Sequence, residues 1–337
     1  MHEHVRAGIA HDAWKAFLDA PAKEDIALRC GPARSASNAT VDHRVVSSLI
    51  GVPLEKRPTV CEQPSERKHL QRLHEAARAR GVSLSVVVIG ANQGGHEGNE
   101  WIGTLIRRYG WRAALVEPVP EMFALLKTNY RTASSVSVHQ LVVHANSSSV
   151  RREGSSGLGQ CAFLHPTPSC SKLTPSYNRT SCGFKGWRAM DLTQMGHVAD
   201  HRGPGLTNPS SGFWLARTAR YMREELLPCL HIGELFQHVQ VPSPDVLMVD
   251  TEGYDFKLFE ALDLCKVRPL FIEMEAKAFT RRQLGLVEAK LQAHGYRVFD
   301  ANAARDATHW RSTWTLLELM ALRTGPVTTP EGCADPS

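Results

Sequence analysis

The stretch LSVVVIGANQGG, residues 84–95, decides the fold that we expect of this chain. Its first half is an almost unbroken apolar run, mostly β-branched, which is typical of a strand buried on both faces of a parallel sheet. Its second half is rich in glycine and precedes a helical pattern that begins near Trp101. Glycines let a backbone turn tightly and approach a ligand, and open α/β sheets bind ligands at the carboxyl ends of their strands. We therefore expect a ligand at this turn.

The same alternation of strand and helix continues along the chain. Strands alternating with helices predict an α/β fold with a doubly wound, mostly parallel sheet and right-handed crossovers. Apolar runs predict further strands at residues 113–116, 136–143, 246–249, 270–274, 296–299 and 312–317. Helical spacing predicts helices at residues 65–80, 120–130, 256–262 and 281–294, with a shorter one through Leu235 and Phe236.

Three segments fall outside this alternation. Residues 1–80 are expected to form an N-terminal helical arm and linker, with a first short amphipathic helix around Trp14. Residues 146–212 are rich in Ser, Gly, Pro and Thr and interrupt the domain expected at residues 81–325. This insertion either has local structure that shapes a substrate pocket or is disordered, and both alternatives stay open. Residues 326–337 are expected to be a flexible tail.

Composition and charge narrow the possible partners. Of the 337 residues, 42% are hydrophobic and 22% charged, which is ordinary for a folded globular protein. The net charge is +5 and basic residues are spread among acidic ones, so we expect no nucleic-acid partner. No run approaches the roughly 18 apolar residues that span a bilayer, so we expect no membrane partner. The sequence does not indicate the oligomeric state.

Cysteine usage and the missing targeting signals indicate a cytoplasmic location. The eight cysteines are widely scattered, which is not the pattern of a disulfide scaffold, so we expect reduced thiols. The amino-terminal residues do not resemble a secretory signal. Asn38, Asn146 and Asn178 stand in glycosylation-type triplets, which we expect to be chance matches in a cytoplasmic protein.

A carboxylate at the end of the second expected strand indicates a nucleoside ligand. Glu117 follows the run at 113–116, and such a carboxylate can accept hydrogen bonds from both hydroxyls of a ribose. Asn92 stands where a dinucleotide-binding turn has its second glycine, and Glu97 and Glu100 would repel a pyrophosphate. These acids suit the ammonium and sulfonium groups of S-adenosylmethionine, although a nicotinamide-dependent oxidoreductase remains the alternative.

Several motifs then resemble those of the FkbM family of S-adenosylmethionine-dependent O-methyltransferases. VIGANQG at residues 88–94 resembles the family's first motif, and VEP at residues 116–118 resembles its second. PDVLMVDTEGYD at residues 244–255 resembles its most distinctive signature. The resemblance implies a Rossmann-like class I methyltransferase with a seven-stranded sheet. It also implies that the cofactor is bound by Gly90, Ala91, Asn92, Gly94, Glu117, Pro118 and Asp250.

One position departs from the family pattern. The family usually has an aspartate two residues before the glycine of the first motif, and this chain has Val88 there. Such an aspartate would help to orient the amino-acid end of the cofactor. A catalytically inactive, methyltransferase-like binding module is therefore a second alternative.

The carboxylates after the strand at 246–249 are the expected catalytic groups. The resemblance implies that Asp250 lies near the methyl group and the substrate, and Asp250 or Glu252 can act as the base toward an acceptor hydroxyl. Asp255 fits better as a carboxylate in the first turn of the next helix. One of Glu273 and Glu275 is expected to face the substrate, and the alternative for these two acids is a salt bridge to Arg268 or Arg281. The expected acceptor is a small molecule or a glycan, and the sequence requires no metal.

Overall fold

The structure is a computed structural model that describes a set of separate residue ranges. These are residues 5–6, 8–9, 12, 64–94, 101–150, 158–166, 197–198, 222–251, 253–276, 279–300, 305–306 and 318–323. The expected helix around Trp14, the expected strand at 312–317 and the tail at 326–337 lie outside them.

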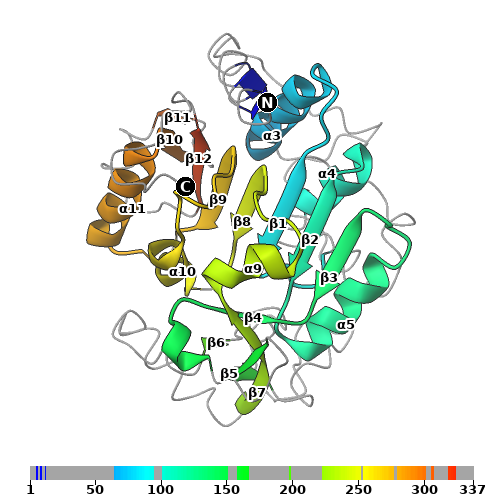
Figure 1. Ribbon diagram of the computed structural model, residues 1–337, viewed down its shortest axis with the longest axis vertical. Helices are drawn as coiled ribbons and strands as arrows, with labels where there is room; N and C mark the ends of the chain where they lie inside the picture. Colours follow the sequence, from blue (N-terminus) through cyan, green and yellow to red (C-terminus); the bar gives the residue numbers. More distant parts are fainter. Residues whose placement is uncertain are drawn as a thin grey trace, which may run out of the picture.

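A mostly parallel sheet forms the centre of the molecule (Figure 1). Its order is β11-β10-β12-β9-β8-β1-β2-β3, and the five strands from β9 to β3 are parallel. β12 is antiparallel to both β9 and β10. The Rossmann-like fold is as expected, and the described sheet has an eighth strand because the two-residue β11 pairs with the end of β10. The bounds are β1 (Ser85–Ile89), β2 (Arg112–Val116), β3 (Val136–His139), β8 (Val246–Val249), β9 (Phe271–Glu275), β10 (Tyr296–Asp300), β11 (Arg305–Asp306) and β12 (Glu318–Arg323).

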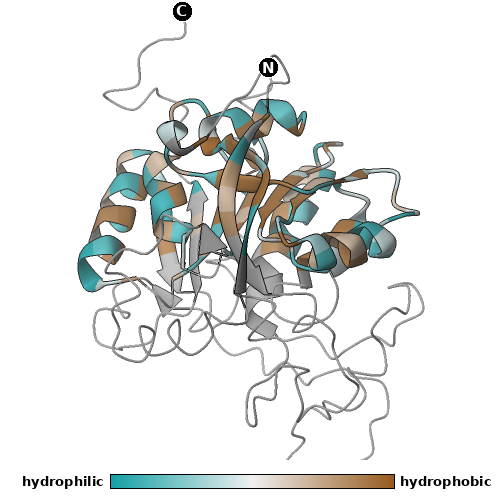
Figure 2. Cartoon of the chain, turned by 90° about the horizontal axis from the view of Figure 1, so that it is seen from below, coloured by the Kyte–Doolittle hydropathy of each residue, from teal (hydrophilic) through white to brown (hydrophobic). Residues whose placement is uncertain are grey.

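Helices cover both faces of this sheet because alternate strand residues supply two apolar cores. Val86 and Val88 belong to one core with α3 (Pro64–Arg78) and α4 (Trp101–Tyr109). Val87 and Ile89 belong to the other, with α9 (Ile232–His238), α10 (Asp255–Ala261) and α11 (Arg281–Ala293). The helix α5 (Pro120–Asn129) contributes to both. Figure 2 shows the apolar central strands between helices that carry both apolar and polar faces.

A second sheet lies beyond the carboxyl ends of the central strands (Figure 1). Its order is β4-β7-β5-β6, with bounds β4 (Val142–His144), β5 (Gly159–Pro166), β6 (His197–Val198) and β7 (Met222–His231). The single strand expected at 136–143 is therefore wrong. The chain leaves the edge strand β3 and then forms β4, which pairs with β7 instead of the central sheet. The expected insertion thus supplies β5 and β6, and the short 3-10 helix η2 (Ser147–Ser149) follows β4.

A disulfide joins two strands of the second sheet. Cys161 of β5 and Cys229 of β7 are both buried, with their Cα atoms 5.6 Å apart. Cys265 is disulfide-bonded as well. The expectation of reduced thiols is therefore wrong for these three cysteines, which are the ones within the described ranges. Cys161 and Cys229 are 68 positions apart in the sequence, so no local pattern indicates the pair, and the antiparallel pairing of β5 with β7 brings the two cysteines together.

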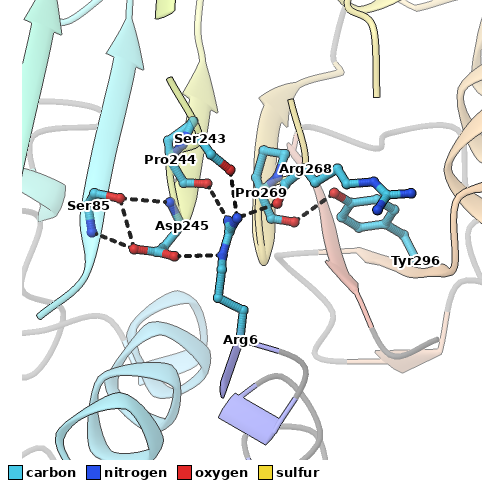
Figure 3. Close-up of polar contacts among 8 residues, drawn as sticks. All are labelled: Arg6, Ser85, Ser243, Pro244, Asp245, Arg268, Pro269 and Tyr296. Atoms are coloured by element: carbon cyan, nitrogen blue, oxygen red, sulfur yellow. Dashed lines mark hydrogen bonds and ion pairs between the residues drawn. The ribbon is translucent and has the colours of Figure 1, made fainter. Parts of the chain in front are cut away.

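The described residues of the N-terminal arm contribute to the domain's core. Leu70 and Leu73 of α3, and Ile9 before it, are fully buried in the same apolar core as residues of α4. Arg6 is 5% exposed and reaches the amino ends of β8 and β9, where it forms an ion pair of 3.1 Å with Asp245 (Figure 3). The arm and the second sheet therefore lie at opposite ends of the central strands.

No helix among the described ranges is long and apolar enough to cross a membrane.

Candidate functional site

The turns after β1, β2 and β8 meet at one edge of the central sheet. The amides of Gly90 and Ala91 both donate to the carbonyl of Val116, at 3.0 and 2.9 Å, and the amide of Asp250 donates to the carbonyl of Ile89 at 2.9 Å. Gly90 has a φ of +83°, and a Cβ on it would lie 1.7 Å from the carbonyl oxygen of Asp250. Gly90 is therefore required for the contact between two turns, a role that the sequence pattern did not reveal.

The rest of the glycine-containing turn is held by side chains around it. Asn92 has a φ of +50°, and its Oδ1 accepts a hydrogen bond from the amide of Gln93 at 2.8 Å. Asn129 at the end of α5 is 5% exposed and donates to the carbonyl of Gln93 at 2.6 Å. Gly94 has a φ of +61°, and a Cβ there would lie 2.5 Å from the ring of Tyr130. The end of α5 thus fixes the shape of the turn.

Glu117 is directed at this turn from the end of β2. Its Oε2 accepts from the amide of Asn92 at 2.7 Å, and its Oε1 accepts from the amide of Val119 at 2.8 Å. Burial raises the pKa of Glu117 to about 7, although the two backbone hydrogen bonds act in the opposite direction. Pro118 follows it directly. Each carboxylate oxygen keeps a second acceptor site, so the pair of acceptors fits a ligand that donates from two neighbouring hydroxyls.

The loop after β8 is organised by Asp255. Its carboxylate is fully buried and accepts from the amides of Thr251 and Gly253, each at 2.9 Å. Burial raises the pKa of Asp255 to about 6, against the effect of these hydrogen bonds. Asp250 begins the loop and is partly exposed, whereas Glu252 lies outside the described ranges. Asp255 therefore supports the loop that carries both expected catalytic carboxylates.

Tyr254 connects this loop to the second sheet, a link that the sequence analysis missed. Its hydroxyl oxygen lies 3.4 Å from Nε2 of His144 and 3.4 Å from the amide nitrogen of Ala145. Both aromatic side chains are buried, and Nδ1 of His144 accepts from the amide of Asn146 at 2.9 Å. The sequence offers Tyr254 in the motif at 244–255 as a signal for this contact. Its partner His144 could not be predicted, because His144 belongs to β4, which the apolar pattern merges with β3 of the central sheet.

Two further acids lie on β9, beside the Asp250 loop. Glu273 is 2% exposed and is the register partner of Met248 in β8. Glu275 is partly exposed, one residue beyond the pair of Met274 with Val249. No group of three or more potential metal ligands occurs among the described residues. Several carboxylates therefore lie at the carboxyl ends of β8 and β9, and among the described residues they do not form a group that could hold a metal ion.

Comparison with known proteins identifies the family. The family described as the methyltransferase FkbM domain matches residues 89–298, from the last residue of β1 into β10. Among solved structures, the precorrin-6y C5,15-methyltransferase of Geobacter metallireducens GS-15 is 10% identical, with a TM-score of 0.30 over 75% of this chain and 87% of that one. The delta-N METTL16 MTase domain is also 10% identical, with a TM-score of 0.35 over 84% and 95%. No curated protein matches the sequence significantly.

Proposed function

This chain belongs to the FkbM methyltransferase family, and from that premise we propose that it transfers the methyl group of S-adenosylmethionine to a hydroxyl of a small molecule or glycan. The observation that carries the proposal is the junction of three turns at one sheet edge. There Glu117 bonds the turn after β1, and that turn contacts the carbonyl of Asp250 after β8. Open α/β sheets bind ligands at this edge.

The cofactor would be held by the turn after β1 and by the end of β2. Glu117 accepts hydrogen bonds from the two ribose hydroxyls with the acceptor sites that its backbone bonds leave. Pro118 follows Glu117 in the sequence, and the glycine-containing turn is hydrogen bonded to that carboxylate through the amide of Asn92. When bound, S-adenosylmethionine supplies a methyl carbon made electrophilic by its sulfonium. The residues of the turn in this proposal are Gly90, Ala91, Asn92 and Gly94.

The acceptor hydroxyl is proposed to meet the loop after β8. Asp250 orients this hydroxyl and takes its proton as the methyl group is transferred, with Glu252 as the second candidate for that role. A base of this kind must come within about 3 Å of the hydroxyl, directly or through one water. Asp255 is a positioning residue, because it binds the loop amides instead of the acceptor. Orientation of the two reactants supplies most of the rate.

The charge of the chain bears on the class of acceptor, and its disulfide bears on the cellular location. Interspersed charges and a net charge of +5 favour a small molecule or glycan over a nucleic acid or a membrane surface. The cytoplasmic location stays a prediction, and the disulfide between Cys161 and Cys229 argues against it, because disulfides persist in oxidising compartments.

Both alternative functions remain testable. Val88 favours an inactive binding module: it is 2% exposed within an apolar core, so the family's aspartate has no equivalent there. A nicotinamide-dependent oxidoreductase would have to bind a pyrophosphate at a turn where Asn92 replaces the second glycine. Family membership favours the methyltransferase over this oxidoreductase.

Calorimetric titration with S-adenosylmethionine, and separately with NADH, tests the cofactor. We expect saturable binding of S-adenosylmethionine only, weakened at least tenfold by Glu117→Gln because a carboxylate acceptor is lost. Glu75→Gln makes the same chemical change on the exposed surface of α3 and should leave binding unaltered. Binding of NADH alone would establish the oxidoreductase, and binding of neither would favour the inactive module.

Transfer of a labelled methyl group to a panel of hydroxylated acceptors tests the reaction. With an acceptor found, Asp250→Asn should keep cofactor binding and lower turnover by about 10²–10⁴-fold, the usual effect of losing a general base. Turnover unchanged in both Asp250→Asn and Glu252→Gln would remove these carboxylates from the reaction.

A further inference from the structure

Asn146 stands at an exposed turn of the second sheet. It follows β4 and precedes η2, and it is exposed together with Ser147 and Ser148. Its Oδ1 accepts from the amide of Ser148 at 3.0 Å and from the Ser148 hydroxyl at 2.9 Å. Within the described part of the chain, no group is hydrogen bonded to its Nδ2. The triplet Asn146-Ser147-Ser148 therefore presents the nitrogen that an N-linked glycan would use, on the surface.

The disulfide of the same sheet supplies an independent observation. Cys229 is the register partner of Val142 in β4, so the strand that leads to Asn146 lies directly beside the disulfide strand. Cys161 and Cys229 are both buried in the core of the sheet. Disulfides form and persist in oxidising compartments such as the lumen of the endoplasmic reticulum. Surface Asn-x-Ser/Thr triplets of secreted proteins are glycosylation acceptors.

We propose that Asn146 carries an N-linked glycan, added in the oxidising lumen in which the Cys161–Cys229 disulfide forms. The donor is an oligosaccharide joined to a polyprenyl diphosphate. A bond forms between Nδ2 of Asn146 and C1 of the first sugar, while the bond from C1 to the diphosphate oxygen breaks. The polyprenyl diphosphate leaves, and Nδ2 gives up one proton to a base of the transferase. Nothing is oxidised or reduced in this step.

The surroundings of Asn146 place the glycan near the candidate site without disturbing it. Its neighbour Ala145 is anchored by its carbonyl, which lies 3.1 Å from Nε2 of His231, and its amide lies 3.4 Å from the Tyr254 hydroxyl oxygen. Asn146 itself is on the exposed side of this anchor. A glycan therefore extends into solvent beside the edge of the second sheet that contacts the Asp250 loop.

Expression of the full chain behind a secretory leader in eukaryotic cells tests the proposal. Peptide mass spectrometry of the unaltered protein should find the Asn146 peptide glycosylated, and peptide N-glycosidase should convert that asparagine to aspartate. Asn146→Gln and Ser148→Ala should each remove one glycan and increase electrophoretic mobility by one step. Ser147→Ala alters the middle residue, keeps the triplet and should keep the glycan.

Two results would overturn the proposal. The first is an unmodified Asn146 in the unaltered, secreted and folded protein, which needs no variant to interpret. The second is free thiols at Cys161 and Cys229, detected by alkylation without reductant in that same protein, because the glycan and the disulfide are assigned to one compartment. A matching glycan and a cross-linked Cys161–Cys229 peptide would support both parts.

Discussion

At Gly90 the chain turns from β1 toward α4 with a φ of +83°, and a Cβ would lie 1.7 Å from the carbonyl oxygen of Asp250. Gly110 has a similar φ of +63° but no atom within 4 Å of the corresponding position. We expect Gly110→Ala to cost only the strain of a left-handed residue, about 1–2 kcal/mol. Gly90→Ala adds a backbone clash and should cost at least about 3 kcal/mol or prevent folding. Urea unfolding of both variants measures this, and equal losses would contradict the close contact of the two turns.

The buried carboxyl of Glu117 should make cofactor binding depend on pH. Its pKa of about 7 lies above the ordinary 4.5, so the folded ligand-free protein holds the extra proton between these values. The stability that this group contributes is therefore full below pH 4.5 and is lost as pH rises through 7. Ribose hydroxyls donate to the ionised form, so affinity should rise about tenfold per pH unit below 7 and level off above it. Calorimetry across that range checks this, and Glu117→Gln should give a flatter profile if Glu117 is responsible.

At the scale of elements, Lys290 of α11 secures the carboxyl end of α10. Its Nζ donates to the carbonyls of Phe259, Glu260 and Leu262 at 3.0, 3.0 and 2.7 Å, at a helix end where carbonyls lack the amides of a following turn. The three hydrogen bonds use all three donors of the ammonium group. Burial lowers the pKa of Lys290, because it disfavours the charged form.

We expect Lys290→Met to lower the free energy of unfolding by about 1–3 kcal/mol, because three carbonyls at the end of α10, two of them in partly buried hydrogen bonds, lose a charged donor. Lys266→Met is the matched control. The side chain of Lys266 is 84% exposed and lies 3.5 Å from Asp263, so its loss should cost no more than about 0.5 kcal/mol. Denaturant titration compares the two variants, and a similar effect of both would mean that the α10–α11 contact does not depend on Lys290.

The sequence predicted those elements whose pattern is local. The run at 246–249 is β8 to the residue, and α5 and α11 end within one residue of expectation, because strands buried on both faces and amphipathic helices have distinct periods. Periodicity cannot tell which strand a segment pairs with. For that reason β3 and β4 were merged, and the pairing of Cys161 with Cys229 was not foreseen.

In the candidate site, the positions of residues at strand ends could be predicted, whereas the contacts between elements could not. Glu117 and Asp250 follow strands whose carboxyl ends meet at one edge, so their proximity follows from the order of parallel strands. The contact of Gly90 with the Asp250 carbonyl depends on the register of β1 and β8, and the contact of Tyr254 with His144 depends on the second sheet. Neither is encoded in a local pattern.

At the scale of the whole molecule, the N-terminal arm is joined to the far end of the sheet by a buried cation. Nη1 of Arg6 donates to Oγ of Ser243 at 2.6 Å, and Nη2 donates to the carbonyls of Pro244 and Arg268 at 2.9 and 2.8 Å (Figure 3). Nε lies 3.1 Å from Oδ1 of Asp245, completing the set. One side chain thus holds together the segments that lead into β8 and β9. Arg6 itself lies outside the family match, which begins at residue 89.

Loss of Arg6 should therefore destabilise the central domain as well as the arm. Arg6→Met leaves the carboxylate of Asp245, in a residue only 9% exposed, without its cation, and such a loss costs about 3–5 kcal/mol. Arg80→Met removes a more exposed pair with Asp12 and should cost at most about 1 kcal/mol. The double variant Arg6→Met/Asp245→Asn should recover part of the loss, because no buried charge is left unpaired. Unfolding in denaturant should show one cooperative transition with a lowered midpoint. An unchanged midpoint in Arg6→Met would mean that the domain is stable without this anchor.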